Sequence, residues 1–133
     1  MIGRELLEMA RVEAARAGLA DFVGAEDCRA AARDLLDEAL DQGGNPQATV
    51  IGTRHRVSAQ QAALVNGTAS HVLDYDDTQH GIGTHMSAPV LGAALAAAET
   101  QKRSGKELIV GFVAGFELGC LLARSGNFAD TLL

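Results

Sequence analysis

The feature that most constrains the fold is the helical spacing of small apolar residues. Such residues recur at intervals of three and four in four segments, which are residues 4–23, 26–41, 58–73 and 87–98. This period places them on one face of a helix. Alanine dominates the apolar fraction, and aromatic residues make up only 4% of the chain. Closely packed helices suit these side chains better than a β-sandwich or barrel.

Local signals mark where several elements begin. Ser58 with Gln61, and Ser104 with Glu107, form two capping-box patterns, in which each member of the pair hydrogen-bonds the other's backbone N–H at a helix start. A short β-pair is expected between the second and third helices, within residues 48–57.

Further signals lie at helix ends and along the last helix. Gly43 and Gly44 are expected to end the second helix. Ser87 is expected to cap the fourth, with Pro89 in its first turn. The fifth helix, ending near Arg124, carries glycine at every fourth position, which predicts a close approach by a neighbouring helix; these are Gly111, Gly115 and Gly119. We therefore predict an all-α fold of about five packed helices.

Charge and cysteine content exclude several classes of protein. The formal net charge is −6, which argues against a nucleic-acid-binding surface. The two cysteines, Cys28 and Cys120, are far apart, so neither a disulfide framework nor a cysteine metal pair is expected and a reducing cytoplasm is the simplest compartment. The N-terminus does not resemble a secretory signal. The apolar run 108–123 is short and contains Glu117, so no membrane span is expected.

Polar side chains that could carry chemistry gather between residues 71 and 85. Several of them are potential metal ligands, namely His71, Asp74, Asp76, His80 and His85. Their spacing matches no strong metal signature, so no metal is expected.

Residues 74–78 also fit the D-x-D-x-T pattern of magnesium-dependent phosphatases of the haloacid-dehalogenase type. That motif needs a buried strand before it, whereas the preceding segment has helical spacing. A solvated turn with no catalytic role is a further alternative, because Asp-rich turns commonly follow helices.

Acid/base chemistry on a carboxylate substrate is the third interpretation. His85 can exchange protons near neutral pH, since an unperturbed imidazole has a pKa of about 6.5. Asp74 and Thr78 are four residues apart and would share a face if the third helix continued through them.

The order of these features resembles the MmgE/PrpD family. Residues 62–78 are similar to its AAxxNGxxxHxLDxDDT stretch, and residues 84–91 to its HPSAPVL stretch. Residues 104–108 and 115–117 resemble the SGxxL and GYE elements that follow. Met86 departs from the pattern, because it stands where proline is usual.

The resemblance implies a fold and a function. The family includes 2-methylcitrate dehydratase, cis-aconitate decarboxylase and an iminodisuccinate epimerase, which act on small polycarboxylates without a metal or organic cofactor. Its members have a large helical domain and a smaller α+β lid, and are usually homodimers. Residues 1–133 would then be the N-terminal portion of the helical domain without the lid, inactive alone and prone to self-association.

The resemblance also implies the site residues. The catalytic positions of the family fall on Asp74, Thr78 and His85, with His85 taking part in proton transfer. We expect substrate contacts from three neighbours, which are Asp77, His80 and Ser87. The loop before His85 is about one residue longer than in decarboxylase-like members, and the later lysines and tyrosine of the family's site have no counterpart here. The alternatives left open are the magnesium phosphatase and a non-catalytic helical subunit.

Overall fold

Four helices and one short β-pair make up the described part of the chain. The computed structural model describes residues 23–73, 75–79 and 83–125. The helices are α2 (Val23–Gln42), α3 (Ala59–His71), α4 (Ser87–Thr100) and α5 (Gly105–Ser125). Two short strands, β1 (Ala48–Thr49) and β2 (Arg56–Val57), form an antiparallel pair between α2 and α3. The predicted all-α fold with a small β-pair is confirmed. The helix predicted over residues 4–23 lies outside the described residues.

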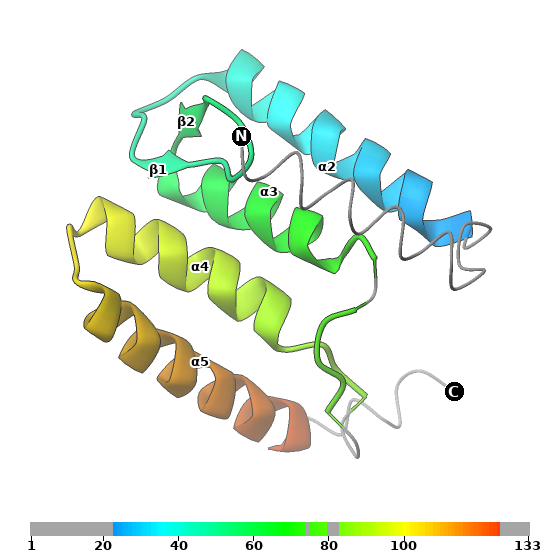
Figure 1. Cartoon of the computed structure of the whole chain (residues 1–133), viewed down its shortest axis with the longest axis vertical. Helices are drawn as coiled ribbons and strands as arrows, with labels where there is room; N and C mark the ends of the chain where they lie inside the picture. The colour runs from blue at the N-terminus through cyan, green and yellow to red at the C-terminus, as the bar shows by residue number, and fades with distance from the viewer. Residues whose placement is uncertain (1–22, 74, 80–82, 126–133) are drawn as a thin grey trace.

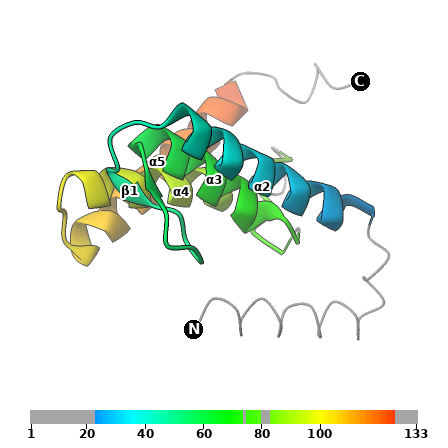
Figure 2. The ribbon, with the colours of Figure 1, turned by 90° about the horizontal axis from the view of Figure 1, so that it is seen from above.

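The helices lie side by side in chain order (Figure 1). α3 packs against α2 on one side and against α4 on the other, and α5 packs against α4. The second view shows the same succession from above (Figure 2). The central pair, α3 and α4, carries the most extensive contact and flanks the polar loop, so it positions whatever chemistry that loop performs.

The capping boxes form as predicted. At the start of α3 the Ser58 N–H donates to Gln61 Oε1 at 3.1 Å, and the Gln61 N–H donates to Ser58 Oγ at 3.4 Å. At the start of α5 the Ser104 N–H donates to the Glu107 carboxylate at 2.9 Å, and the Glu107 N–H donates to Ser104 Oγ at 3.3 Å. Both helices therefore begin where a local sequence pattern satisfies their first backbone N–H groups.

The predicted cap of α4 is wrong. Met86 is the N-cap residue and makes no side-chain capping bond, while Ser87 is the first helical residue. The Ser87 N–H instead donates to Asp77 Oδ1 at 2.8 Å. The helix start is thus satisfied by a carboxylate from the preceding loop, a contact that no local serine pattern could indicate.

Within the described part of the chain, the glycines of α5 do not make the close contact with the backbone of a neighbouring helix that their spacing predicts. A Cβ at Gly115 would lie 2.9 Å from Val90 Cγ1, and one at Gly119 would collide with the Met86 side chain. Gly111 faces open space. Two of the three glycines therefore make room for side chains, Val90 of α4 and the N-cap residue Met86, rather than for a helix backbone.

α3 and α4 approach each other closely at Gly92. A Cβ at Gly92 would lie 2.7 Å from the Ala63 carbonyl oxygen and 2.9 Å from the Gly67 nitrogen. These are backbone atoms, which cannot turn aside as a side chain can. Glycine at position 92 is therefore what allows the two helices to approach so closely.

The core beneath the β-pair is built from small side chains, with one buried polar residue among them. The buried apolar members are Ala39, Ala48, Val50, Val57, Ala62, Val65 and Ala96. Asn66 is only 8% exposed. Its Nδ2 donates to the Thr49 carbonyl and its Oδ1 accepts from the Ile51 N–H, both at 2.9 Å. Asn66 thereby attaches the β1 segment to α3.

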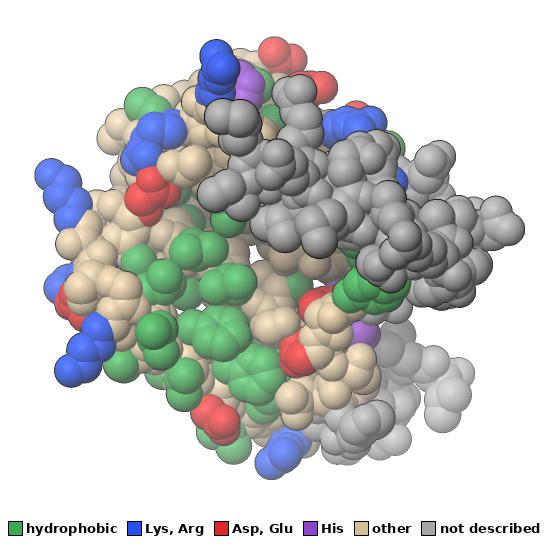
Figure 3. Space-filling view, viewed as in Figure 1, with side chains coloured by type: hydrophobic (Ala, Val, Ile, Leu, Met, Phe, Trp, Pro, Cys, Tyr) green, Lys and Arg blue, Asp and Glu red, His purple; other side chains and the backbone are tan. Residues whose placement is uncertain are grey.

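α5 leaves much of its apolar surface uncovered. Its exposed large apolar residues are Ile109, Val110, Val113, Leu118, Leu121 and Leu122. Apolar side chains gather over α4 and α5 on one face of the molecule (Figure 3). By length and composition α5 could cross a membrane. The helix is longer than the apolar run 108–123, from which the sequence predicted that no segment spans a membrane. The core helix of a soluble protein passes the same test of length and composition, but such a helix is mostly buried, whereas only 6% of the apolar window of α5 is buried among the described residues.

Candidate active site

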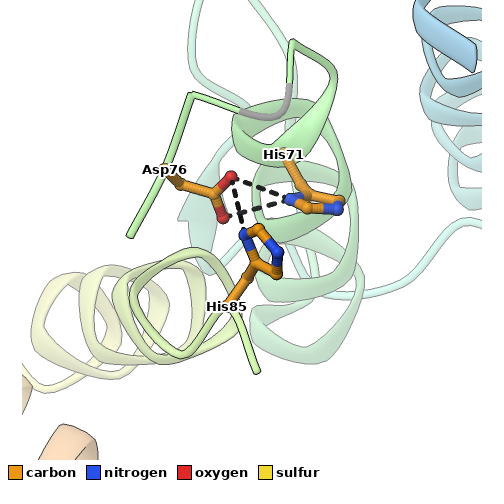
Figure 4. Close-up of side chains that lie close together, drawn as sticks. All are labelled: His71, Asp76 and His85. Carbon is orange, nitrogen blue, oxygen red and sulfur yellow. Dashed lines mark hydrogen bonds and ion pairs between the residues drawn. The ribbon is translucent and has the colours of Figure 1, made fainter. Parts of the chain in front are cut away.

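Two histidines face one carboxylate where the polar loop joins α3 to α4 (Figure 4). His71 Nδ1 lies 2.9 Å from Asp76 Oδ1 and 3.1 Å from Oδ2. His85 Nδ1 lies 3.5 Å from Asp76 Oδ1. The two rings meet edge to face with their centroids 4.9 Å apart. We call these three side chains, His71, Asp76 and His85, the His–Asp–His cluster.

The fold positions each member of the cluster by a different element. His71 is the last residue of α3, and His85 lies two residues before α4 begins. The loop between them reverses direction because the Gln79 N–H donates to the Thr84 carbonyl at 3.0 Å, while Gly83 adopts a left-handed φ of 57°. The close contact of α3 with α4 then holds the two histidines at a fixed separation.

Asp76 and its neighbour Asp77 have separate roles. The Asp76 side chain is 9% exposed and faces the histidines. Asp77 faces the start of α4, where its carboxylate accepts from Ser87. Burial acts to raise the pKa of Asp77, but hydrogen bonds from Ser87, Gln79 and the Met86 backbone outweigh it, so the pKa lies below its ordinary value. Asp77 is therefore held as a carboxylate at the positive end of the α4 dipole.

A groove of about 570 Å³ runs beside the cluster. His71 and His85 are its only ionisable lining residues among those described, and the rest of the lining is Ala63, Leu64, Gly67, Thr68, Ala88 and Pro89. The volume suits a small ligand, because small-molecule sites typically enclose about 300–1,000 Å³. An apolar groove with two imidazoles at one end can bind a small molecule and exchange protons with it.

Of the predicted catalytic residues, only His85 lies in the cluster. Thr78 is exposed, and α3 ends at His71, so the condition under which Asp74 and Thr78 would share a helical face is not met. Asp74 and His80 lie outside the described residues. Asp77 and Ser87, predicted to bind substrate, contact each other at the start of α4.

Sequence reasoning passed over two members of the cluster. His71 is predicted only as a possible metal ligand or packing residue, and Asp76 only as a metal ligand or as part of the phosphatase motif, so neither is assigned to the carboxylate-substrate site. The signal was present, since both occupy fixed letters of the AAxxNGxxxHxLDxDDT stretch that residues 62–78 resemble. What could not be deduced is that one carboxylate faces both histidines.

The phosphatase alternative is not supported by the fold. Its motif requires a buried β-strand just before the first aspartate. The segment before Asp74 is instead α3, a 13-residue helix with a complete capping box. An aspartate that follows a helix does not stand at the end of a sheet, where that chemistry takes place.

Comparison with known proteins decides the family. The profile of the MmgE/PrpD N-terminal domain matches residues 7–132. The chain belongs to the MmgE/PrpD family. The match covers nearly all of the chain, including α3, the His–Asp–His cluster, α4 and α5. No solved structure shows a match to it.

Curated MmgE/PrpD relatives match shorter parts of the chain. A cis-aconitate decarboxylase-like protein, oryM, of Aspergillus oryzae is 33% identical over 63% of the chain and 19% of its own length. Human cis-aconitate decarboxylase is 42% identical over 47% of the chain and 14% of its own length. The mouse cis-aconitate decarboxylase is 39% identical over 56% and 16%. The matched segments thus span less than a fifth of each relative.

Proposed function

We propose that the chain is the N-terminal portion of a cofactor-free lyase that removes water or carbon dioxide from a small di- or tricarboxylate, with 2-methylcitrate the first substrate to test. The observation that carries the proposal is the His–Asp–His cluster at the edge of a ligand-sized groove. Family membership and the decarboxylase names of the relatives support the same class of reaction.

His85 carries the proton in this proposal. Loss of water from a carbon beside an activated C–H needs a base that takes the proton and an acid that protonates the leaving hydroxyl. Asp76 faces Nδ1 of His85. The contact is 3.5 Å long here, and catalytic hydrogen bonds commonly tighten when substrate binds. A carboxylate hydrogen-bonded to one ring nitrogen fixes the orientation and tautomer of an imidazole, so the substrate proton is then exchanged through Nε2. Asp76 is then a positioning residue, and His71 shares its carboxylate.

The substrate's negative charges need partners from outside this cluster. Residues 71–85 contain no Lys or Arg, and none is found among the described residues that line the groove. Asp76 and Asp77 add negative charge of their own. A polycarboxylate would be repelled unless cationic side chains came from elsewhere in a larger protein, because charge stabilisation is usually the largest contribution to such catalysis. We therefore propose that residues 1–133 alone do not turn over substrate.

We also propose that the chain associates with itself. The exposed apolar side chains of α5 form a surface that soluble proteins ordinarily cover, since large apolar patches mark interfaces. A second copy is the simplest occupant, because most soluble homo-oligomers are symmetric dimers built from one surface patch.

A chimera tests the lyase proposal. Residues 1–133 replace the corresponding N-terminal segment of mouse cis-aconitate decarboxylase, and purified protein is assayed for loss of water from 2-methylcitrate and of carbon dioxide from cis-aconitate. We expect turnover by the chimera and none by residues 1–133 alone. His85→Gln should abolish turnover of the chimera, whereas His55→Gln, a change at an exposed histidine outside the groove, should leave it intact.

Two results would count against the proposal. Turnover that survives His85→Gln in a folded chimera would remove the assigned role of His85. A folded chimera with no turnover of any polycarboxylate would instead favour the non-catalytic helical subunit. Circular dichroism of each variant establishes that the comparison is between folded proteins.

A further inference from the structure

The His–Asp–His cluster has the chemistry of a metal site. It combines two imidazoles and one carboxylate, and one ligand atom from each residue can be chosen so that all three lie within 4.8 Å of one another. His71 Nδ1 lies 2.9 Å, and His85 Nδ1 3.5 Å, from Asp76 Oδ1. The residues are separated by five and nine positions in the sequence, and they lie at the end of α3, in the loop and just before α4. No linear signature therefore indicated them.

These separations suit a tetrahedral ion. Zinc binds imidazole nitrogen and carboxylate oxygen at about 2.0–2.2 Å, so two ligands of one tetrahedral ion lie about 3.3 Å apart. The two nitrogen-to-oxygen distances, 2.9 and 3.5 Å, bracket that value. All three ligand atoms lie within 4.8 Å of one another, so binding of one ion would draw them closer together through movement of the side chains.

We propose that the His–Asp–His cluster binds a divalent transition-metal ion of the zinc type. His71, Asp76 and His85 supply three ligands, and the fourth position faces the groove, where water or a carboxylate of a small molecule completes the tetrahedron. This departs from the sequence-based expectation of no metal.

The donor set selects the class of ion. Calcium requires six to eight oxygen ligands, and magnesium requires octahedral oxygen coordination. Two nitrogens and one oxygen instead suit zinc, cobalt, nickel or copper. Asp76 and Asp77, with no Lys or Arg in residues 71–85, also give the loop a local negative charge that attracts a cation.

The fold holds the ligands in place before an ion arrives. The Gly92 contact fixes α3 against α4, and with them the residues at their facing ends, His71 and His85. The capping contact between Asp77 and Ser87 fixes the loop beside Asp76. Both histidines line the open groove, which gives an ion a path to them.

Metal binding would compete with proton transfer. A metal on Nδ1 of His85 and on Asp76 takes away the carboxylate that orients the ring, so the ion acts as an inhibitor of the lyase. This competition rests on the proposed function. The metal site itself does not, because it is measured without substrate.

Direct binding to residues 1–133 tests the site. Zn²⁺ binding is measured by titration calorimetry, and Co²⁺ is used as a visible probe, because four-coordinate Co²⁺ has strong d–d absorption. We expect one ion per chain, with no heat from Mg²⁺. His71→Ala and Asp76→Asn should each weaken Zn²⁺ binding at least about tenfold. His55→Ala is the matched control and should leave the affinity unchanged.

The outcomes decide the proposal. No Zn²⁺ binding by the wild-type chain overturns it, as does binding that neither His71→Ala nor Asp76→Asn weakens. The two variants change different elements, so if one fails to fold by circular dichroism the other still decides. Turnover by the chimera does not test the metal site. A chimera that binds Zn²⁺ through these residues but turns over no substrate would contradict the lyase proposal and leave the metal-site proposal standing.

Discussion

Gly92 of α4 lies against Gly67 of α3 with no space for a side chain between them. A Cβ on Gly92 would come within 2.9 Å of the Gly67 nitrogen and 3.2 Å of its Cα. The helices that meet here are the two that carry His71 and hold His85 in place. The geometry of the cluster therefore depends on a contact between two residues that have no side chains.

Gly92→Ala should destabilise the chain by about 1–3 kcal/mol, because the new methyl group meets backbone that can move only by separating the helices. Gly111→Ala is the matched control, since that position faces open space in α5. There alanine should stabilise by up to about 1 kcal/mol through its higher helix propensity. Urea denaturation measures both. Equal effects of the two substitutions would show that the α3–α4 contact is not close.

Asn66→Ala should cost about 2–3 kcal/mol, because it leaves the Thr49 carbonyl and the Ile51 N–H without the partner that Asn66 now supplies beside the core. Ser70→Ala is the control on the same helix. Its hydroxyl is exposed and donates only to the Gly67 carbonyl of α3, so its removal should change stability little. A loss with Ser70→Ala as large as that with Asn66→Ala in urea denaturation would contradict the assigned role of Asn66.

Glu99→Gln should destabilise the chain at neutral pH by about 1 kcal/mol, and the difference from wild type should disappear in acid. Hydrogen bonds from the Thr49 side chain and backbone, with Arg56, hold the pKa of Glu99 below its ordinary value against the effect of burial. A carboxylate with a lowered pKa contributes stability that is present above the unfolded pKa, about 4.3, and is lost as the pH falls through the folded pKa.

Thermal melts of both proteins from pH 7 down into this acid range test the Glu99 prediction. The wild-type melting temperature should fall toward that of Glu99→Gln as the carboxylate becomes protonated. Glu38→Gln on α2 is a control at an exposed carboxylate. A constant gap between wild type and Glu99→Gln across the range would mean that the charge of Glu99 does not matter.

Local sequence patterns correctly predicted the helix caps whose two residues lie close together in the chain. The Ser58–Gln61 and Ser104–Glu107 boxes could be found from the sequence because each member is three residues from its partner. The Asp77 cap on Ser87 could not, because the two residues are ten apart and Ser87 itself already fitted the pattern of a capping residue.

The same limit applies to the site. His85 could be selected as a proton carrier from its residue type and from the family resemblance. Its relation to Asp76 depends on how the loop reverses between Gln79 and Thr84, and its relation to His71 on how closely α3 meets α4. Both are properties of the packed chain rather than of any segment within it.

Asp76→Asn and Asp77→Asn should separate positioning from capping. In the chimera, Asp76→Asn should lower turnover by about a hundredfold or more, because the amide no longer favours the imidazole state needed for proton transfer. Asp77→Asn should retain most turnover and instead lower stability by about 0.5–1 kcal/mol, because it removes a charge from the start of α4. Turnover and thermal melts are measured on both. Equal losses of turnover would show that the two carboxylates do not have separate roles.

Val113→Glu should shift residues 1–133 from an oligomer toward a monomer. Val113 is 53% exposed and lies on the same side of α5 as Val110 and Leu121, so a charge there would have to be buried if a second copy covered this surface. Ile51→Glu is the matched control, since Ile51 is 63% exposed but lies in the turn between β1 and β2. Sedimentation velocity over a range of concentrations measures the mass of all three proteins. We expect a concentration-dependent oligomer for the wild-type chain and for Ile51→Glu, and a smaller species for Val113→Glu. A wild-type chain that sediments as a monomer at every concentration, or an oligomer that Ile51→Glu disrupts as strongly as Val113→Glu, would show that α5 is not the surface through which the copies associate.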